Sequence, residues 1–397
     1  MLFEFDNLGD QKAKIKVVGV GGAGGNAINR MIASGLGGVE FIAINTDAQD
    51  LDNNKSEIKI QIGKNLTKGL GAGAKAEIGR EAIESEKDAV VNVLDDADMV
   101  FVTAGMGGGT GTGAGPAIAE IAREMGALTV GIITKPFHFE GPKRMNRALS
   151  GCEEMQRCCD TVIAIPNQKL ISIVDQSTTV IDAFRLADSI LLHATRAISD
   201  LINVHGLINL DFADVETIMY GMGDAIMGTG IATGEERAVL AAQQAISSPL
   251  LEEVNIGGAQ GVLVNITGGD NLTLHEVDEA TSIIFEEAGN EANIIFGAVI
   301  DPTLEEEIRV TVIATGFHQV CKLIDNGIPF PLQEKTPFSK MEASKVTTME
   351  NKPAYQKKMT TDEKTEDETQ ETPGSKLTFG GESDDLEIPA FLRQQNQ

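Results

Sequence analysis

The sequence predicts an α/β fold: a largely parallel, Rossmann-like sheet, a long central helix, and a second, smaller α/β domain. Short apolar runs rich in β-branched residues alternate with helix-patterned stretches in the first half of the chain. Apolar side chains then recur at helical spacing around residue 190, and further apolar runs follow. Alternating strands and helices are typical of a parallel sheet covered by helices.

The strands expected of this fold are the apolar runs themselves. Those of the first domain are Ile15–Val20, Val39–Asn45, Met99–Thr103, Leu128–Ile133 and Thr161–Ile165. Those of the second domain are Gly261–Thr267, Asn293–Val299 and Glu307–Ala314. The central helix follows from the three- and four-residue spacing of Ile181, Phe184, Ala187, Leu191, Ala194, Ile198 and Leu201.

Composition divides the chain further. After about residue 320 the sequence is rich in Lys, Glu, Thr, Ser and Pro, with little apolar periodicity, which predicts a disordered linker. The expected divisions are a flexible N-terminus (1–14), a first domain (15–178), the central helix (179–205), a second domain (206–320), the linker (321–383) and a terminal peptide (384–397).

Charge and composition exclude several classes of function. The chain has 32 basic and 59 acidic residues, a formal charge of −27, and no Trp, which disfavours nucleic-acid binding. It has neither a signal peptide nor an apolar run of the roughly 20 residues that span a bilayer, so we expect a cytoplasmic protein without direct membrane insertion. The four cysteines and five histidines show no metal-site spacing, and we predict no metal site in the protein itself.

The first glycine-rich segment, Gly19–Ala27, directly follows an apolar run and leads into a helical pattern. Glycine lets the backbone approach a phosphate, and the free N–H groups at a helix start favour negative charge. Gly19, Gly21 and Gly24 also fit the GxGxxG fingerprint of dinucleotide-binding enzymes, with Asp47 placed as the ribose-binding acid. Alone, this segment favours a dehydrogenase.

The second glycine-rich segment, Ala104–Gly113, changes that balance. It follows the run at Met99 and precedes a helix expected to begin at about Pro116. A dehydrogenase does not need it, whereas two glycine loops at neighbouring strand ends can enclose one triphosphate, with the Thr110 and Thr112 hydroxyls as added donors. Neither loop contains the Gly-Lys-Ser/Thr of a P-loop, so backbone N–H groups must bind most of the anion. Either loop alone is also compatible with a plain tight turn.

The motif Gly107–Gly113 (GGGTGTG) matches the signature loop of the tubulin superfamily, and the chain as a whole resembles the FtsZ family, its members in bacterial cell division. The resemblance extends over about residues 10 to 320 and the last dozen. It implies that the first domain binds GTP or GDP, with Mg²⁺ accompanying the nucleotide, and that the second domain activates hydrolysis.

The resemblance also implies a set of nucleotide-binding residues. They are Gly21, Gly22, Ala23, Gly24, Gly25, Asn26, Asp47, Gly71, Ala72, Gly73, Gly107, Gly108, Gly109, Thr110, Gly111, Thr112, Gly113, Glu140, Arg144, Phe184 and Asp188. Glu140 and Arg144 would contact the ribose. Phe184 would stack on the base while Asp188, four residues later, accepts its N–H groups and so selects guanine. Without the resemblance, Phe184 would be a core residue and Asp188 a solvated charge.

An acidic segment follows the central helix. Asp211 and Asp214 are three residues apart at a predicted helix start, where acids also serve as plain helix caps. In the family, however, this segment leaves one subunit and meets the γ-phosphate of the next. The resemblance therefore implies that Asn209, Asp211 and Asp214 are catalytic, in an active site shared between subunits that stack head to tail.

The terminal peptide restores apolar side chains after the polar linker. It resembles the family's C-terminal peptide, which binds membrane-tethering adaptors and division regulators, although packing on its own core is an alternative. The residues expected to bind partners are Asp385, Leu386, Ile388, Pro389, Phe391 and Leu392.

Together these features predict a cytoskeletal GTPase that polymerises into the septal ring at mid-cell, beneath the inner membrane, with hydrolysis driving filament turnover. Two alternatives stay open: a related tubulin-like filament for plasmid partition or cell shape, and a nucleotide-dependent oxidoreductase. The second glycine loop disfavours the oxidoreductase, and the terminal peptide disfavours the other filaments.

Overall fold

The computed structural model describes residues 12–175, 177–204, 206–208, 210–251, 256–289 and 291–317, all within the compact unit Met1–Leu332. Asn209, the linker 321–383 and the terminal peptide 384–397 lie outside the described residues, so the predictions made for them stay predictions. No helix in the described ranges is both long and apolar enough to cross a membrane.

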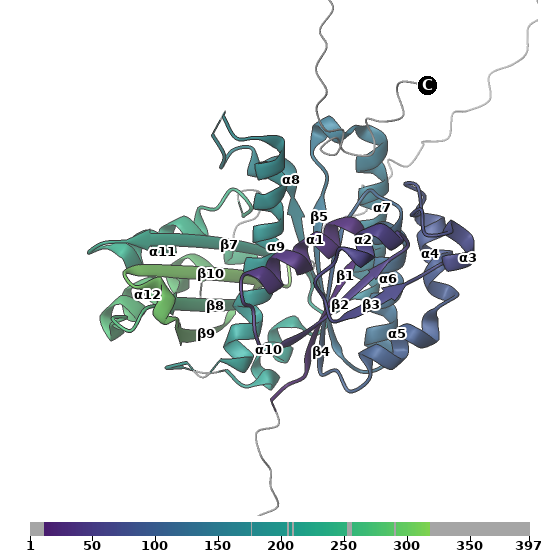
Figure 1. Ribbon diagram of the computed structural model, residues 1–397. Coiled ribbons are helices and arrows are strands. Elements are labelled where there is room, and N and C mark those ends of the chain that lie inside the picture. The colour runs from purple at the N-terminus through teal and green to yellow at the C-terminus, as the bar shows by residue number, and fades with distance from the viewer. Residues whose placement is uncertain are drawn as a thin grey trace, which may run out of the picture. The chain divides into compact units, whose positions relative to one another are not determined.

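The first half of the chain forms a parallel sheet with helices on both faces (Figure 1). Its order is β3-β2-β1-β4-β5-β6, and every pair in it is parallel. The strands are β1 (Ile15–Val20), β2 (Val39–Asn45), β3 (Ile58–Gln61), β4 (Met99–Gly105), β5 (Leu128–Lys135) and β6 (Thr161–Pro166). The central strands are almost wholly buried, as a sheet covered on both faces requires.

The helices of this half include three long ones and several short ones. They are α1 (Gly21–Ala33), α2 (Ala48–Asp52), α3 (Lys64–Thr67), α4 (Ala76–Glu84), α5 (Lys87–Leu94), α6 (Thr110–Glu124), η1 (His138–Glu140), α7 (Pro142–Cys158) and α8 (Asn167–Leu170). The apolar core on one face of the sheet includes residues of α1, and the core on the other face includes residues of α6 and α7. Helix α6 begins at Thr110, earlier than the predicted Pro116. Its first turn consists of the threonines and glycines of the second loop, with Pro116 inside the helix.

The central helix α9 (Val180–Asn203) lies between the two halves of the molecule (Figure 1). It begins at Thr179, whose side chain accepts a hydrogen bond from the Asp182 N–H and so satisfies one free donor of the first turn. Its buried residues, among them Leu191, Ile198 and Leu201, belong to a core that also contains Leu263 and Val299 of the second half. This shared core fixes the helix to both halves.

The second half adds four strands to the same hydrogen-bonded sheet, in the order β7-β10-β8-β9. Strand β7 is parallel to β6 over only three residue pairs, Thr161↔Gly223 to Ile163↔Ala225, and β10 is antiparallel to both β7 and β8. The elements are α10 (Phe212–Met219), β7 (Gly223–Thr233), α11 (Arg237–Ile246), η2 (Ile256–Gly258), β8 (Gly261–Gly268), α12 (Leu274–Ala288), β9 (Asn293–Ile300), η3 (Pro302–Leu304) and β10 (Glu307–Thr315). The predicted α/β class, with its parallel sheet and central helix, is confirmed.

Candidate functional site

The first glycine segment forms the start of α1. Strand β1 ends at Val20, and α1 begins at once with Gly21, which has a left-handed backbone with φ of 71° that favours glycine. No side chain caps this helix start. The N–H groups of its first turn and the positive end of its dipole are therefore available to an anion at the carboxyl end of the sheet.

The second glycine segment connects β4 to α6 at the same edge. Its loop is closed by the Gly107 N–H, which donates to Thr112 Oγ1 over 2.9 Å, and is held from outside by Arg147 Nε, which donates to the Gly107 carbonyl over 3.1 Å. Nothing lies within 4 Å of the position that a Cβ on Gly108 would take. A ligand can therefore approach this backbone closely. Arg147 was not predicted, because a lone basic residue in a helix gives no sequence signal.

The two glycine loops touch. A Cβ on Gly21 would lie 3.0 Å from the Gly111 nitrogen, and Thr46 Oγ1 and Thr110 Oγ1 share a buried hydrogen bond of 2.6 Å. Thr46 directly follows β2, so the carboxyl ends of three strands, β1, β2 and β4, meet at this point. Two phosphate-binding helix starts in contact can act on a single polyphosphate.

The predicted third segment, Gly71–Gly73, lies against the second loop. A Cβ on Gly109 would come within 2.8 Å of the Ala72 Cβ, and one on Gly113 would collide with the Ala76 carbonyl oxygen. Gly73 has a left-handed backbone and open space around its Cα. The structure therefore brings all three predicted glycine segments together at one edge.

Asp47 has a structural role in the fold, and its predicted role in nucleotide binding stays a prediction. Its Oδ1 caps α2 by accepting from the Gln49 and Asp50 N–H groups, while its Oδ2 lies 3.7 Å from the Cβ position of Gly71. Asp50, which was not predicted, places Oδ2 only 3.1 Å from the Cβ position of Gly22. Burial, and then the charge of Asp47, raise the pKa of Asp50, and a hydrogen bond from Asn45 partly offsets this.

A small pocket lies between the first loop and α2. Asn54, also missed by the prediction, donates from Nδ2 to the Gly25 carbonyl over 2.9 Å and so fixes that loop. The pocket is lined by Gly19, Gly21, Gly22, Gly25, Asn26, Asn29, Ala43, Ile44, Asn45, Asp50, Leu51, Asn53 and Asn54. Its asparagines lie on several elements, and only the tertiary structure places them together.

The start of α9 supplies an aromatic surface beside these loops. Phe184 is 40% exposed, and Phe137 packs edge-on against it at 5.4 Å. Phe137 is itself buried and stacks on Phe139 at 5.0 Å. Phe184 is therefore a supported but accessible ring, which fits stacking on a base better than a place in the core.

Glu140 and Arg144 lie next to this surface and bind each other. Glu140 Oε1 accepts from the Phe137 N–H over 2.8 Å, and Oε2 pairs with Arg144 Nε at 3.1 Å. Asn167, at the end of β6, was not predicted, although its Oδ1 is buried without a hydrogen-bond partner among the described residues. An unpaired buried acceptor beside a binding site is a candidate ligand contact.

Asp188 lies one helical turn after Phe184, and burial raises its pKa to about 6, an effect that Arg30 partly opposes. The ionised form accepts two N–H groups of guanine, whereas the protonated form loses one acceptor. Nucleotide affinity should therefore fall as the pH drops below about 6.

We expect GDP to bind roughly tenfold more weakly at pH 5 than at pH 7 through this group. Because the nucleotide phosphates also titrate, the quantity to compare by calorimetry is the difference between the native protein and Asp188→Asn. The variant should bind weakly with little of this pH dependence. Asp182→Asn, an exposed acid on the same helix, should behave like the native chain, and identical pH profiles for all three proteins would contradict this role.

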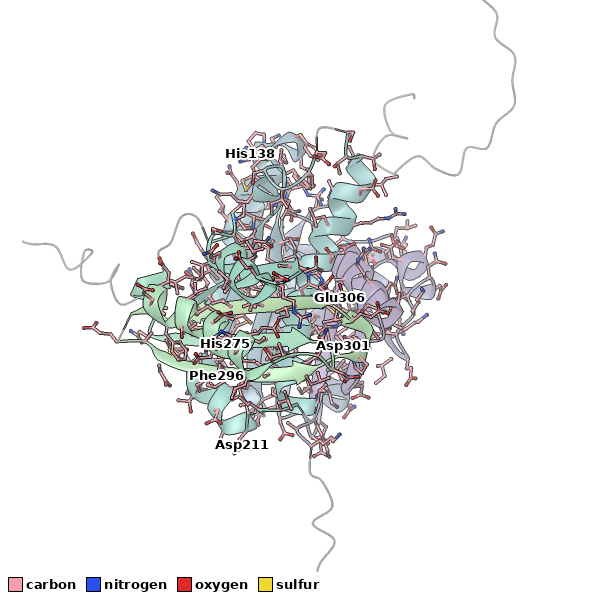
Figure 2. All side chains as sticks on the ribbon, turned by 90° about the vertical axis from the view of Figure 1, so that its left-hand side faces the viewer. His138, Asp211, His275, Phe296, Asp301 and Glu306 are labelled. Atoms are coloured by element: carbon pink, nitrogen blue, oxygen red, sulfur yellow. The ribbon has the colours of Figure 1, made fainter. Side chains whose placement is uncertain are left out.

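The acidic segment lies at the other end of the molecule. Figure 2 shows Asp211 at the opposite end from His138, which belongs to η1 beside the glycine loops. Asp211 is the N-cap residue of α10 but makes no side-chain capping hydrogen bond, and its N–H donates to Asp214 Oδ2 over 3.3 Å. The plain capping role therefore belongs to Asp214. The described residues bring no predicted catalytic acid near the glycine loops of the same chain.

Comparison with known proteins identifies both halves. Residues 14–175 match the model of the Tubulin/FtsZ family GTPase domain, and residues 223–318 match that of the FtsZ family C-terminal domain. Among solved structures, an empty FtsZ dimer from M. jannaschii is 45% identical, with a TM-score of 0.75, over 78% of this chain and 89% of that one.

Two further structures are similar. An FtsZ mutant from M. jannaschii is 46% identical over 77% of this chain and 91% of that one, with a TM-score of 0.74. A GTPγS-bound protofilament of CetZ2 from Haloferax volcanii is 21% identical over 79% of this chain and 99% of that one, with a TM-score of 0.65. At this sequence identity the similarity to CetZ2 shows a shared fold and no more.

Proposed function

Since the chain belongs to the Tubulin/FtsZ family and carries its GTPase domain, we propose that it is a division protein whose active site is completed by a second copy. Binding of GTP or GDP follows from the family. The observation that supports the shared site is the separation within one chain. Asp211, which is hydrogen-bonded to Asp214, lies at the opposite end of the molecule from His138 (Figure 2). The glycine loops lie on the His138 side, because Gly107 is next to Arg144 and Arg144 pairs with Glu140 of η1.

Exposed apolar side chains at both ends support head-to-tail assembly. Near the glycine loops, Leu70 is 81% exposed, Phe139 64% and Ile181 65%, while Leu207 and Tyr220 beside the acidic segment are 66% and 63% exposed. The two groups differ, so the contact is heterologous, and a heterologous contact that does not close produces a filament. The solved FtsZ dimer from M. jannaschii supports self-association of this chain.

The proposed chemistry is hydrolysis of the bond between the β- and γ-phosphates of GTP. The glycine loops hold the triphosphate by backbone N–H groups, and Phe184 and Asp188 hold the guanine. Asp211 of the next subunit orients a water and accepts its proton while the water oxygen attacks the γ-phosphorus and the bond to the β-phosphate breaks. Asp214 and Asn209 are proposed to complete this surface.

The carboxylates beside the first loop fit an accompanying Mg²⁺. Asp47 and Asp50 both lie next to glycines of the phosphate loops, where they would repel a triphosphate. We propose that Asp47, Asp50 and Asn45 hold the ion, directly or through water. When bound, it neutralises charge on the phosphates.

The shared site predicts that turnover depends on assembly. GTP hydrolysis per subunit should be slow at low protein concentration and rise above a threshold at which light scattering also rises. Turnover per subunit that is independent of concentration would overturn the shared site while leaving the GTPase itself intact.

The role in division depends on the terminal peptide and is tested separately. A chain ending near residue 380 should polymerise normally but fail to bind membrane-tethering adaptors, and a fluorescent fusion of it should no longer concentrate at mid-cell. Normal adaptor binding and mid-cell placement of the shortened chain would exclude Asp385, Leu386, Ile388, Pro389, Phe391 and Leu392 as the contact.

A further inference from the structure

Strand β9 is the last strand of the sheet, and among the strands of the described residues it pairs with β8 alone, in parallel. The Asn293 N–H donates to the Gln260 carbonyl, on the β8 side, over 2.8 Å. Because the N–H and C=O groups of successive residues alternate between the two sides of a strand, Ile294, Phe296 and Ala298 direct theirs away from β8. The sheet therefore ends in an edge formed by these three residues and, by the same alternation, Ile300.

This edge is covered only in part. The Leu207 N–H donates to the Ala298 carbonyl over 2.9 Å, and the Ala298 N–H donates to the Ile208 carbonyl over 3.2 Å in an antiparallel bridge. Within the described part of the chain, nothing hydrogen-bonds to the outward groups of Ile294 and Phe296. Leu207 and Ile208 thus pair with Ala298 like a short added strand. The part of the edge formed by Ile294 and Phe296 stays open.

The open part is apolar. Ile294, Ile295 and Phe296 are half-buried. Phe296 meets Phe285 of α12 at 6.4 Å with the rings inclined by 69°, and Phe285 is 40% exposed. Figure 2 views the molecule from the side of this second half and labels Phe296 on it. An uncovered apolar edge is a surface that proteins ordinarily blunt with Lys, Pro or a bulge, and Asn293–Phe296 contains none of these.

The sequence that carries the open part of this edge is acidic. Between Arg237 and Arg309 the sequence contains no Lys or Arg and thirteen Asp and Glu residues. On α12 beside β9, Asp278 and Glu286 are exposed, and Glu291 immediately precedes the strand. Two copies pairing edge to edge would bring these charges together, so the charge favours a partner of opposite sign.

We propose that Ile294 and Phe296 of β9 accept an extended, basic segment of another protein as an added strand of the sheet. Its main chain pairs with the outward N–H and C=O groups, its apolar side chains meet Phe285 and Phe296, and its lysines or arginines lie near Asp278 and Glu286. This proposal is independent of GTP hydrolysis and of the terminal peptide.

The test uses the full chain with GDP and a strand-length synthetic peptide of alternating lysine and valine. Hydrogen exchange should slow at the Ile294 and Phe296 amides when the peptide binds and stay unchanged at Ile295, whose N–H already faces β8. Binding without protection at Ile294 and Phe296, or no measurable binding, would overturn the proposal.

Matched peptides and variants separate strand pairing from charge attraction. A peptide of equal charge with prolines at alternate central positions should bind roughly tenfold more weakly, since it cannot pair. Ile294→Pro should weaken binding of the unmodified peptide by a similar factor, and Ile294→Val should not.

The charge contribution is tested with a second pair of variants. The double variant Asp278→Asn with Glu286→Gln should reduce the salt dependence of peptide binding, whereas Glu77→Gln with Glu81→Gln on α4 should leave it unchanged. If the proline peptide binds as tightly as the unmodified peptide, the interaction is nonspecific attraction between opposite charges, and strand addition is refuted.

Discussion

Asp211→Asn should retain GTP binding and assembly while turnover in the polymer falls by about a hundred- to ten-thousand-fold, the usual contribution of a positioned general base. Asparagine caps a helix as well as aspartate does, so α10 should keep its start. The substitution therefore removes the charge that the proposed chemistry needs and little else. Phosphate release and light scattering, measured together, give the result.

Two further variants isolate that effect. Asp211→Ala should cause the same loss of turnover and, because the exposed Asp211 side chain makes no capping hydrogen bond, should change the unfolding free energy by less than about 0.5 kcal/mol. Glu216→Gln removes a neighbouring exposed acid of the same helix and should leave turnover intact. Native turnover by Asp211→Asn would exclude the Asp211 carboxylate from the hydrolysis.

Arg237→Ala should destabilise the second half of the molecule by about 3–5 kcal/mol, because it leaves a carboxylate without its partner in a mostly buried site. Arg237 is 6% exposed and contacts both carboxylate oxygens of Glu276, at 2.6 and 3.2 Å. Its other donors bind the carbonyls of Glu306 and Asn271 and the Asn271 side chain. One side chain thus joins α11, α12 and the segment before β10, and thermal unfolding with GDP bound measures its contribution.

Two controls interpret that loss. Lys87→Ala breaks an exposed pair with Glu124 and should change the unfolding free energy by less than about 1 kcal/mol. Combining Arg237→Met with Glu276→Leu removes both charges and should recover much of the stability, since no buried charge is left unpaired. If Arg237→Ala has the same unfolding free energy as the native chain, the contacts of Arg237 with Glu276, Glu306 and Asn271 contribute no net stability.

The same pair makes stability depend on pH in a defined direction. The hydrogen bond from Arg237 lowers the pKa of Glu276 to about 2, below its unfolded value of 4.5. The folded state therefore binds this proton less readily, so the stabilisation is complete above about pH 4.5 and is lost as the pH falls towards 2. The gap in unfolding free energy between the native chain and Glu276→Gln should narrow over that range. If this difference in unfolding free energy stays constant from pH 4.5 to pH 2, the stabilisation comes from an interaction other than the ionised Glu276.

Local features of the sequence were sufficient for the glycine loops and most strands. A glycine segment directly after an apolar run predicts a strand, a phosphate-binding turn and a helix, because backbone access and helix dipoles are properties of neighbouring residues. The long helix could also be predicted, since its apolar residues recur at helical spacing and α9 keeps one buried face from Ala187 to Leu201. By contrast, β3 and β7 were missed. Gly228 and Gly230 of β7 look like turn residues, but a Cβ on either would collide with backbone carbonyls of α11.

What the sequence determined by itself is a chain with two glycine loops at strand ends, a long amphipathic helix and an acidic segment after it. The tertiary structure decided that Asp211 lies at the opposite end from the loops, that Asp50, Asn54 and Arg147 reach them, and that β9 keeps an open edge. The physical reason is the range of the interactions. Turns and helix starts depend on adjacent residues, whereas the meeting of strand ends, and which strand remains unpaired, depend on packing between segments far apart in the chain.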